Sequence, residues 1–382
     1  MAVCVLSTAM ALAYAFKNGL GNAPDEPAHA AYVLALARDA RLPVWNRPKQ
    51  PDSYEFFQPP LYYAAASALY RSLAFLPLRG RLLALRVFSC LLHGTALLLI
   101  GGLASKIGKA PGSSLAPMIL VAALPMFLFL GSSISNDAAA DLAGAALLCW
   151  AATRESPPAL SDWAVFGALG GAALLCKLTT APLAAAGALR LALMEKDKGR
   201  AVKRLALAAA LCAVMAGWFY WRNLSLYGDA TGVGLIGRED TSRYGYARLG
   251  LWLWLFFQSF WGRFGWMTRP MPLWTYGILL ALCAASALGW LFHAKALWRR
   301  PARPFLLAAL VLTLASAFNF GFFRSFQPQG RYAFPALAAW AVLLWDGLGA
   351  WLEALPPRLV RFVYGALALA AGAVQLAAWR SL

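Results

Sequence analysis

The sequence predicts an all-α polytopic membrane protein, a bundle of about eleven transmembrane helices with short helices along the outer membrane surface. Composition is the first reason: 61% of the 382 residues are hydrophobic and only 13% are charged, against about 25% charged residues in an average soluble domain. The second is that charge-free stretches recur along the whole chain. Since about 20 apolar residues span a bilayer, a soluble enzyme, a disordered tail protein and a disulfide-stapled secreted domain are excluded.

Individual spans are expected where Asp, Glu, Lys and Arg are absent, and one more where Asp141 alone interrupts the stretch. The first stretch is either a retained helix, which we favour, or a cleaved signal peptide. Three further helices are expected to lie along the outer surface, over 27–40, from 59–60 to 70, and over 249–260. The expected spans are 1–16, 87–105, 115–135, 138–153, 163–176, 178–189, 205–221, 272–293, 304–323, 333–345 and 362–379.

The expected orientation rests on short basic loops, because such loops stay in the cytoplasm. They lie at 106–109, 196–204 and 295–303. All of them fall on one side only if 163–176 and 178–189 are separate passes divided at Lys177. We therefore expect two passes in this region.

Two long outer segments then remain, at about 17–86 and 222–271, and residues 1–382 form a single integral membrane domain with no separate soluble domain. The cytoplasmic loops account for only about half of the formal net charge of +18. The remaining positive charge lies on the outer side. We expect it to bind an anionic lipid carrier, with contacts to lipid head groups as the alternative.

Two acidic residues follow the first span in the motif PDEPAH. Asp25 and Glu26 could supply a general base and a metal or hydrogen-bond partner. The alternative is that they stabilise the amino end of the helix that starts at Pro27. His29, one turn later, is expected to be structural or a hydrogen-bond partner, because no second His stands nearby.

A second polar motif, SNDAAAD, lies at the outer mouth of the fourth span. Asp137 and Asp141 are four residues apart and share one helix face. Asp141 then lies one turn inside the membrane, where ionisable groups usually mark a site. Equally, Asn136 or Asp137 could cap the helix while Asp141 reaches outward.

Basic residues gather at the same outer face. Arg and Lys at helix ends could clamp a phosphate or diphosphate, or they could reach individually to lipid head groups. The residues are Lys177, Arg222, Arg263 and Arg331. Since there is no P-loop or HExxH motif and the cytoplasmic loops are short, the chemistry is expected to face outward.

Together, several motifs resemble the GT-C superfamily of membrane glycosyltransferases, which includes protein O-mannosyltransferases and the aminoarabinose transferase of lipid A. The resemblance is greatest to a family of bacterial membrane proteins predicted to be GT-C enzymes. The motifs span most of the chain in the expected order: PDEPAH (24–29), FQPPLYY (57–63), SNDA (135–138), WRNLSLYGD (221–229), SFWGRFGW (259–266) and QGRYAFPALA (329–338).

This resemblance implies a GT-C-like bundle that transfers a sugar from a polyprenyl-phosphate carrier to an acceptor hydroxyl, with inversion. It implies that Asp25 takes the proton of the acceptor and that Glu26 orients the acceptor or shares the proton. Asp137 and Glu55 would bind the acceptor or a divalent ion. The leaving phosphate would be held by Lys177, Arg222 and Arg331. Further substrate-binding candidates are His29, Gln58, Asn136, Arg263 and Tyr332.

The expected location is a bacterial plasma membrane, with the site facing the exterior or periplasm. The acceptor could be a lipid, a glycan or a protein, and no nucleic-acid partner is expected. The chain is short for the superfamily and has no DxD motif, which leaves open whether Mg²⁺ or Mn²⁺ binds, with Asp25 and Asp137 as the candidate ligands.

The rival interpretation is a transporter or a flippase for lipid-linked sugars. Transporters usually carry ionisable or broken-helix sites near the membrane midplane, whereas here acids and bases gather at one mouth of the bundle. His93 is the clear titratable residue within a span, and we expect it to bond to a neighbouring helix. A non-catalytic partner of a larger complex is the third interpretation.

Overall fold

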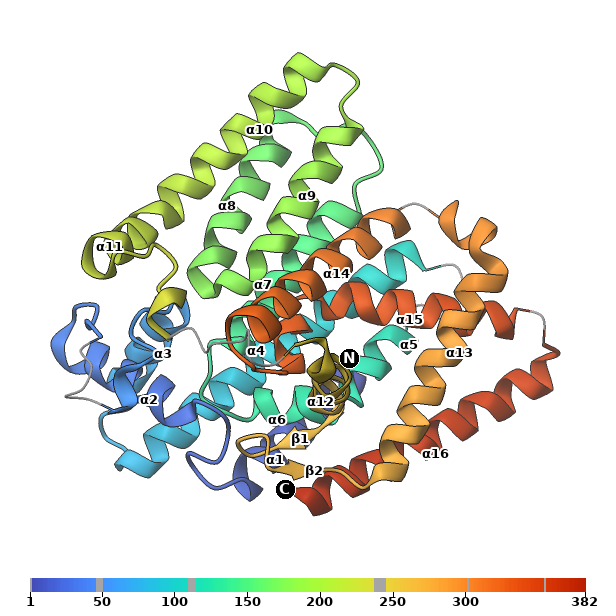
Figure 1. Ribbon diagram of the computed structural model, residues 1–382, viewed down its shortest axis with the longest axis horizontal. Coiled ribbons are helices and arrows are strands. Elements are labelled where there is room, and N and C mark those ends of the chain that lie inside the picture. The colour runs from blue at the N-terminus through green and yellow to red at the C-terminus, as the bar shows by residue number, and fades with distance from the viewer. Residues whose placement is uncertain (1, 46–50, 109–114, 237–244, 301, 354) are drawn as a thin grey trace.

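The computed structural model describes residues 2–45, 51–108, 115–236, 245–300, 302–353 and 355–382, and it is built mainly from helices (Figure 1). The expected all-α architecture is confirmed. The helices of the bundle are α1 (Ala2–Lys17), α4 (Leu78–Ile107), α5 (Ala116–Ala122), α6 (Pro125–Gly131), α7 (Asp137–Ala152), α8 (Leu160–Cys176), α9 (Ala181–Met194), α10 (Lys198–Cys212), α11 (Trp218–Tyr227), α13 (Leu273–Trp298), α14 (Arg303–Phe318), α15 (Leu337–Leu352) and α16 (Pro357–Ser381).

Shorter elements complete the end of the molecule that carries the acidic motifs. The three further helices expected from the sequence are present as α2 (Glu26–Asp39), α3 (Leu61–Ser72) and α12 (Leu249–Trp261). After α12, β1 (Arg263–Phe264) pairs antiparallel with β2 (Arg269–Pro270) in a small hairpin. Single turns of tighter or wider helix are η1 (Pro51–Ser53), η2 (Leu178–Thr180), η3 (Ala213–Gly217), η4 (Val233–Ile236), η6 (Tyr246–Arg248), η7 (Asn319–Arg324) and η8 (Gly330–Ala336).

Within the described residues, 6 helices are long and apolar enough to cross a membrane. They are Leu78–Ile107, Lys198–Tyr227, Leu273–Trp298, Arg303–Arg324, Gly330–Leu352 and Pro357–Ser381. The remaining expected spans correspond to shorter helices, which are α1, the α5–α6 pair, α7, α8 and α9. Both outer segments are shorter than expected, because α4 already begins at Leu78 and α11 continues to Tyr227.

One expected span is broken into two helices. The stretch 115–135 divides after α5, where Leu124 adopts an extended conformation (φ −79°, ψ 110°) and Pro125 begins α6. Proline disfavours a helical conformation in the residue before it and has no N–H for the helix ladder. Sequence hydropathy alone did not distinguish this break from a continuous span.

Lys177 divides α8 from α9, as expected. Its backbone is extended (φ −166°, ψ 141°) and ends α8, and the chain then turns through η2 into α9. Figure 1 shows α8, α9 and α10 side by side. The expected division of this region into two helices at Lys177 is therefore present.

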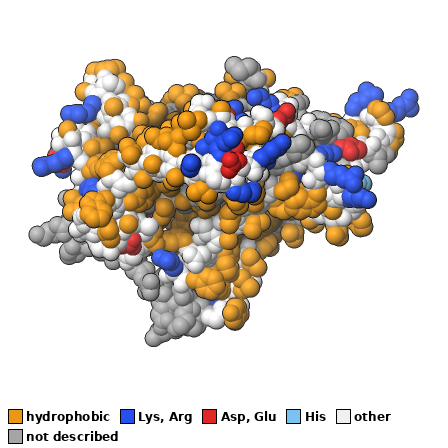
Figure 2. Space-filling model, turned by 90° about the horizontal axis from the view of Figure 1, so that it is seen from above, with side chains coloured by type: hydrophobic (Ala, Val, Ile, Leu, Met, Phe, Trp, Pro, Cys, Tyr) orange, Lys and Arg blue, Asp and Glu red, His pale blue; other side chains and the backbone are white. Residues whose placement is uncertain are grey.

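The basic loops lie at one end of the bundle and the acidic motifs at the other. At the first end, Arg190 of α9 donates to the carbonyl oxygen of Ala151 at the end of α7 (2.7 Å). There too, Arg303 at the start of α14 donates to the carbonyl oxygen of Ile107 at the end of α4 (2.8 Å). The last residue of the first predicted basic loop, 109, lies outside the described residues. Figure 2, seen from above, shows Lys and Arg side chains gathered among exposed hydrophobic ones.

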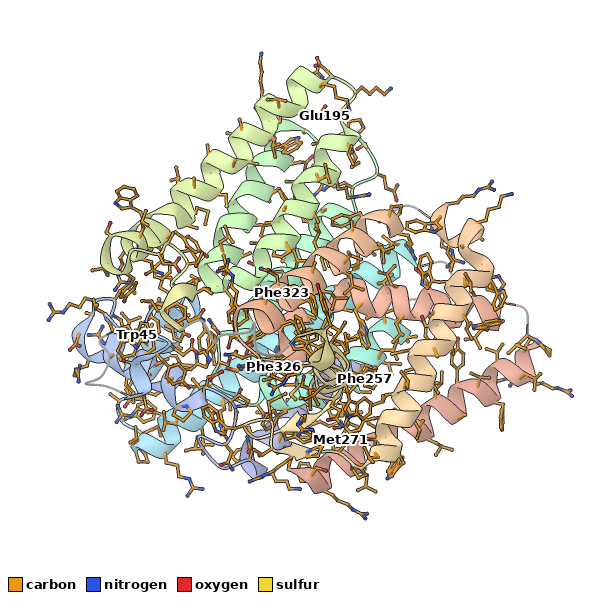
Figure 3. The ribbon with its side chains drawn as sticks, in the orientation of Figure 1. Trp45, Glu195, Phe257, Met271, Phe323 and Phe326 are labelled. Atoms are coloured by element: carbon orange, nitrogen blue, oxygen red, sulfur yellow. The ribbon has the colours of Figure 1, made fainter. Side chains whose placement is uncertain are left out.

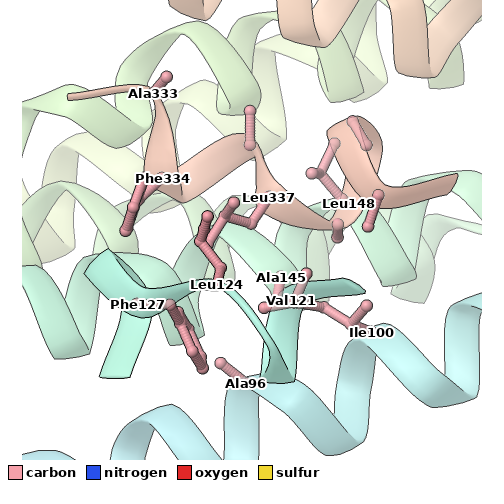
Figure 4. Packing of buried hydrophobic residues seen from close by; sticks show 14 of the residues in the cluster. Ala96, Ile100, Val121, Leu124, Phe127, Ala145, Leu148, Ala333, Phe334 and Leu337 are labelled. Atoms are coloured by element: carbon pink, nitrogen blue, oxygen red, sulfur yellow. The ribbon is translucent and has the colours of Figure 1, made fainter. Parts of the chain in front are cut away.

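The core joins the middle helices of the bundle tightly. Figure 4 shows Ala96 and Ile100 of α4, Phe127 of α6, and Ala145 of α7 meeting around Leu337 at the start of α15. The backbones approach closely at Gly144, where a Cβ would fall 2.2 Å from the carbonyl oxygen of Pro335. Helix α7 therefore packs directly against the backbone of η8, with no room for a side chain at Gly144.

We expect Gly144→Ala to destabilise the protein, because the added methyl has no room beside η8. The matched control is Gly372→Ala in α16, where a Cβ meets nothing within 4 Å. Overpacking costs about 1–3 kcal/mol, whereas alanine in an open helical position is neutral or stabilising. Melting temperatures in one detergent test this, and equal melting of both variants would contradict the packing described.

Candidate functional site

A cavity of about 770 Å³ opens at the end of the bundle opposite the basic loops. Its walls come from the loop before α2, the segment 54–59, the break at Lys177, and the ends of α11, α14 and η8. Trp45, labelled in Figure 3, closes one side and donates its backbone N–H to the hydroxyl of Tyr227 (3.0 Å). The charged and polar side chains on the walls include Asp25, His29, Tyr54, Glu55, Gln58, Lys177, Gln327, Gln329, Arg331 and Tyr332.

Asp25 lies on the cavity wall in a strained backbone conformation. Its φ of 61° is in the left-handed region, which a non-glycine residue adopts at a cost of about 1–3 kcal/mol, mostly at functional sites. Tyr54 donates its hydroxyl to Oδ1 (3.1 Å), and Arg331 donates from Nη2 to Oδ2. The carboxylate is thus fixed on both sides and still faces the cavity.

Arg331 joins Asp25 to a second carboxylate. Its Nη1 donates to Oδ2 of Asp137 (3.3 Å), and Lys177 donates from Nζ to Oδ1 of the same residue (2.6 Å). Asp137 begins α7, Lys177 follows α8, and Arg331 lies in η8, so three helix ends supply the network. Two cations and two carboxylates alternate along it.

Glu55 is different, because it is buried without a cationic partner at contact distance. Its side chain is only 8% exposed, and Oε2 has no hydrogen-bond partner among the described residues. Burial, and then the negative charge of Asp25, raise the pKa of Glu55 to about 8. The pKa of Asp25 is lowered instead, since Arg331 outweighs the opposing effect of burial. At neutral pH, Glu55 is therefore protonated and Asp25 is ionised.

His29 is a buried, neutral hydrogen-bonding residue. Its Nδ1 lies 2.7 Å from the hydroxyl oxygen of Tyr63, and its Nε2 lies 3.4 Å from that of Ser135. Burial and the charge of Lys177 lower the pKa of His29 to about 3. The expectation of a structural or hydrogen-bonding role fits this geometry.

Glu26 points away from the cavity although it is adjacent to Asp25. Arg86 donates to both of its oxygens, from Nε to Oε1 and from Nη2 to Oε2 (2.7 Å each). The backbone N–H groups of Gly21 and Ile134 donate to the same carboxylate, at 2.8 and 3.0 Å. Glu26 therefore joins α2 to Arg86 of α4 and to the backbone at Gly21 and Ile134, and its side chain does not line the cavity.

The other predicted residues divide into two groups. Gln58 and Tyr332 line the cavity, and Asn136 lies behind Gln58 with 3.5 Å between their side-chain amides. Arg222 and Arg263 do not line it. Arg222 donates to the carbonyl oxygen of Pro43 (2.7 Å), and Arg263 donates to that of Met267 (2.6 Å).

Asp141 is buried inside the bundle and is bonded to His93 (2.9 Å). Neither residue lines the cavity. The expected bond from His93 to a neighbouring helix is confirmed, since the two residues belong to α4 and α7. Asp141 therefore neither reaches outward to the surface nor lines the cavity, which were the two alternatives.

Several residues of the site were not predicted. Tyr54, Gln329 and Arg86 each bond directly to a predicted residue, as does Ser135. Gln329 and Ser135 lie inside the motifs QGRYAFPALA and SNDA, and Tyr54 stands three residues before FQPPLYY, so proximity in sequence was the available signal. Arg86 lies at the start of a long apolar helix, and nothing in its neighbourhood indicates its partner.

The described residues do not fit a divalent metal site. They contain no group of three or more His, Cys, Asp or Glu side chains that could hold an ion. Asp25 and Asp137, the candidate ligands, are both bonded to Arg331, whose charge opposes that of a metal ion.

No protein-family model matches the chain, and no curated protein matches it significantly. Two crystal structures of ArnT from Cupriavidus metallidurans do, one bound to undecaprenyl phosphate and one in the apo state. Each has a TM-score of 0.53 and 18% sequence identity, covering 93% of this chain and 60% of the ArnT chain. The chain thus spans less than two thirds of the ArnT length. The expected GT-C-like membrane fold is confirmed.

We expect Glu26→Gln to destabilise the protein strongly, because it removes the charge that compensates the fully buried Arg86. Breaking such a buried pair costs about 3–5 kcal/mol. The control is Asp39→Asn on the same helix, where only an exposed surface pair with Arg38 is lost and the melting temperature should change little. Thermal unfolding of both variants measures the difference, and equal stability would contradict a structural role for Glu26.

Proposed function

We propose that the protein transfers a sugar from a polyprenyl-phosphate carrier to an acceptor hydroxyl at the outer face of the membrane, with inversion. The observation that carries the proposal is the Asp25–Arg331–Asp137–Lys177 network, within a GT-C-like membrane fold. Asp25, Lys177 and Arg331 of this network line the cavity, and Asp137 lies behind them. One of the matching ArnT structures is bound to undecaprenyl phosphate, which supports a lipid of this class as the donor carrier.

The proposed reaction is a direct displacement. The acceptor oxygen forms a bond to the anomeric carbon while its proton passes to the carboxylate of Asp25. The bond between the anomeric carbon and the phosphate oxygen breaks, and its electron pair leaves with the phosphate. Lys177 and Arg331 stabilise the negative charge that develops there.

Arg331 connects donor binding to the strength of the base. In the free protein it neutralises Asp25, whose lowered pKa makes it a weak base. A donor phosphate that bonds to Arg331 competes with Asp25 for the guanidinium. The pKa of Asp25 then rises, so that its basicity increases only when the donor is bound.

The remaining walls suit the carrier lipid. Phe219 and Tyr220 of α11 face the cavity, as do Ala317 and Phe320 near the end of α14. Apolar and aromatic walls of this kind accommodate an isoprenoid chain, while the charged network lies opposite. The chain would leave between α11 and α14 toward the membrane.

The direction of the cavity follows from the positive-inside rule. Because the basic loops lie at the other end of the bundle, the cavity would open away from the cytoplasm, in keeping with a lipid-presented donor. A lipid, a glycan or a protein could provide the acceptor hydroxyl. No step of this reaction is assigned to a metal ion.

We expect Asp25→Asn to reduce sugar transfer by about 10²–10⁴-fold, the contribution typical of a positioned general base. Transfer of radiolabelled sugar from polyprenyl phosphate by protein reconstituted in liposomes measures it. Asp39→Asn, an exposed acid on α2, is the control and should leave transfer unchanged.

Near-normal transfer by Asp25→Asn would refute the assignment of the base. A flippase gives a different result. It would move the lipid-linked sugar across the liposome membrane without any acceptor, and Asp25→Asn would not affect that movement.

We expect carrier binding to weaken as pH rises through about 8, because Glu55 then ionises and adds a negative charge to the cavity. A group whose pKa is raised by folding also stabilises the protein less as pH rises through that value. Glu55→Gln should remove the alkaline loss of affinity for the carrier lipid. The same loss in wild type and Glu55→Gln would exclude Glu55 as its cause.

A further inference from the structure

A second cavity, of about 880 Å³, lies on the other side of the segment 51–58. The same short segment forms a wall of both cavities. Ser53 and Phe56 face the second cavity, whereas Tyr54, Glu55 and Phe57 face the first. The remaining residues that line the second cavity are Ala31, Leu34, Ala35, Ala37, Arg38, Asp52, Tyr70, Arg71, Ala74 and Arg81.

Two arginines in this cavity are available to bind a ligand. Arg81 lies over the ring of Tyr70, with 4.4 Å from its guanidinium carbon to the ring centre. Its buried Nε has no hydrogen-bond partner among the described residues. Arg71 is exposed and makes no ion pair with the described residues. Arg38, in contrast, already binds Asp39 through two hydrogen bonds, at 2.8 and 2.9 Å.

The cavity lies beside the charged first part of α4, before the apolar part of that helix begins. Helix α4 has 30 residues and is about 45 Å long, which exceeds the hydrocarbon thickness of about 30 Å. Its charge-free part begins at 87, so Arg79 and Arg81 precede the apolar region. In the turn between α3 and α4, Phe75 is 78% exposed and Leu78 is 52% exposed. Exposed apolar residues flanked by arginines are typical of a segment at the membrane interface.

We propose that this second cavity binds the phosphate group of an anionic lipid, held by Arg71 and Arg81. A planar guanidinium donates two parallel hydrogen bonds to phosphate oxygens. The stacking of Arg81 on Tyr70 orients its free edge, while Leu34, Ala35 and Ala74 provide apolar wall beside it. This site is separate from the donor cavity, and the proposal does not depend on the reaction proposed above. A soluble phosphate offers the same chemistry and is the alternative source.

The test is native mass spectrometry of the full-length protein in detergent, with phosphatidic acid as the probe and phosphatidylcholine as the lipid without net charge. Wild type should retain phosphatidic acid preferentially. Arg71→Gln with Arg81→Gln should lower that affinity about tenfold or more, since two charge-assisted contacts are lost. Arg79→Gln is the matched control, because Arg79 is an exposed arginine of α4 that does not line the cavity.

Equal losses in the double variant and in Arg79→Gln, or no loss in either, would overturn the proposal. Arg71→Gln alone changes an exposed residue and should fold normally, so a weaker loss in this variant also supports the site. Competition with inorganic phosphate distinguishes the two sources. Displacement of phosphatidic acid indicates a site for phosphate itself, whereas retention of the lipid indicates a site that requires the whole head group and its chains.

Discussion

The geometry of the site depends on one buried ion pair, between Arg86 and Glu26. Arg86 donates five hydrogen bonds, two to Glu26 and three to the carbonyl oxygens of Ala15, Asn18 and Gly19. These bonds tie the end of α1, the start of α2 and α4 together. Because such a pair is costly to bury unless every donor is satisfied, the chain has little freedom here. Asp25, the residue before Glu26, is consequently forced into a left-handed conformation on the cavity wall.

The second constraint is the balance of charge at the cavity. The sequence suggested a cluster of cations that awaits a phosphate, but Lys177 and Arg331 are each bonded to acids in the free protein. With Glu55 protonated, the two carboxylates, Asp25 and Asp137, balance the two cations, Lys177 and Arg331. An anion would therefore bind by displacing a carboxylate from Lys177 or Arg331. If Glu55 were ionised, its negative charge would weaken the binding of that anion.

Hydropathy and charge were sufficient to predict the helical bundle, the two passes at Lys177 and the outer helices, because burial in lipid leaves a strong compositional signal. They did not predict the break at Pro125, since the flanking residues are equally apolar. The motifs located Asp25, Lys177 and Arg331. They did not show which of the two adjacent acids, Asp25 or Glu26, faces the cavity. That choice between Asp25 and Glu26 is made by Arg86, a contact across 60 positions in the sequence that composition and spacing do not encode.

With the proposed orientation, the excess positive charge that the sequence predicts on the outer side would lie outside the cavity. The positive-inside rule explains only the charges of the cytoplasmic loops, and the cations of the network are cancelled by Asp25 and Asp137. Arg71, Arg79 and Arg81, by contrast, make no ion pair with the described residues and precede the apolar part of α4. Part of the unbalanced charge is thus carried by arginines that precede the apolar part of α4. On the two proposals, an anionic lipid and the sugar donor would bind on opposite sides of the segment 51–58.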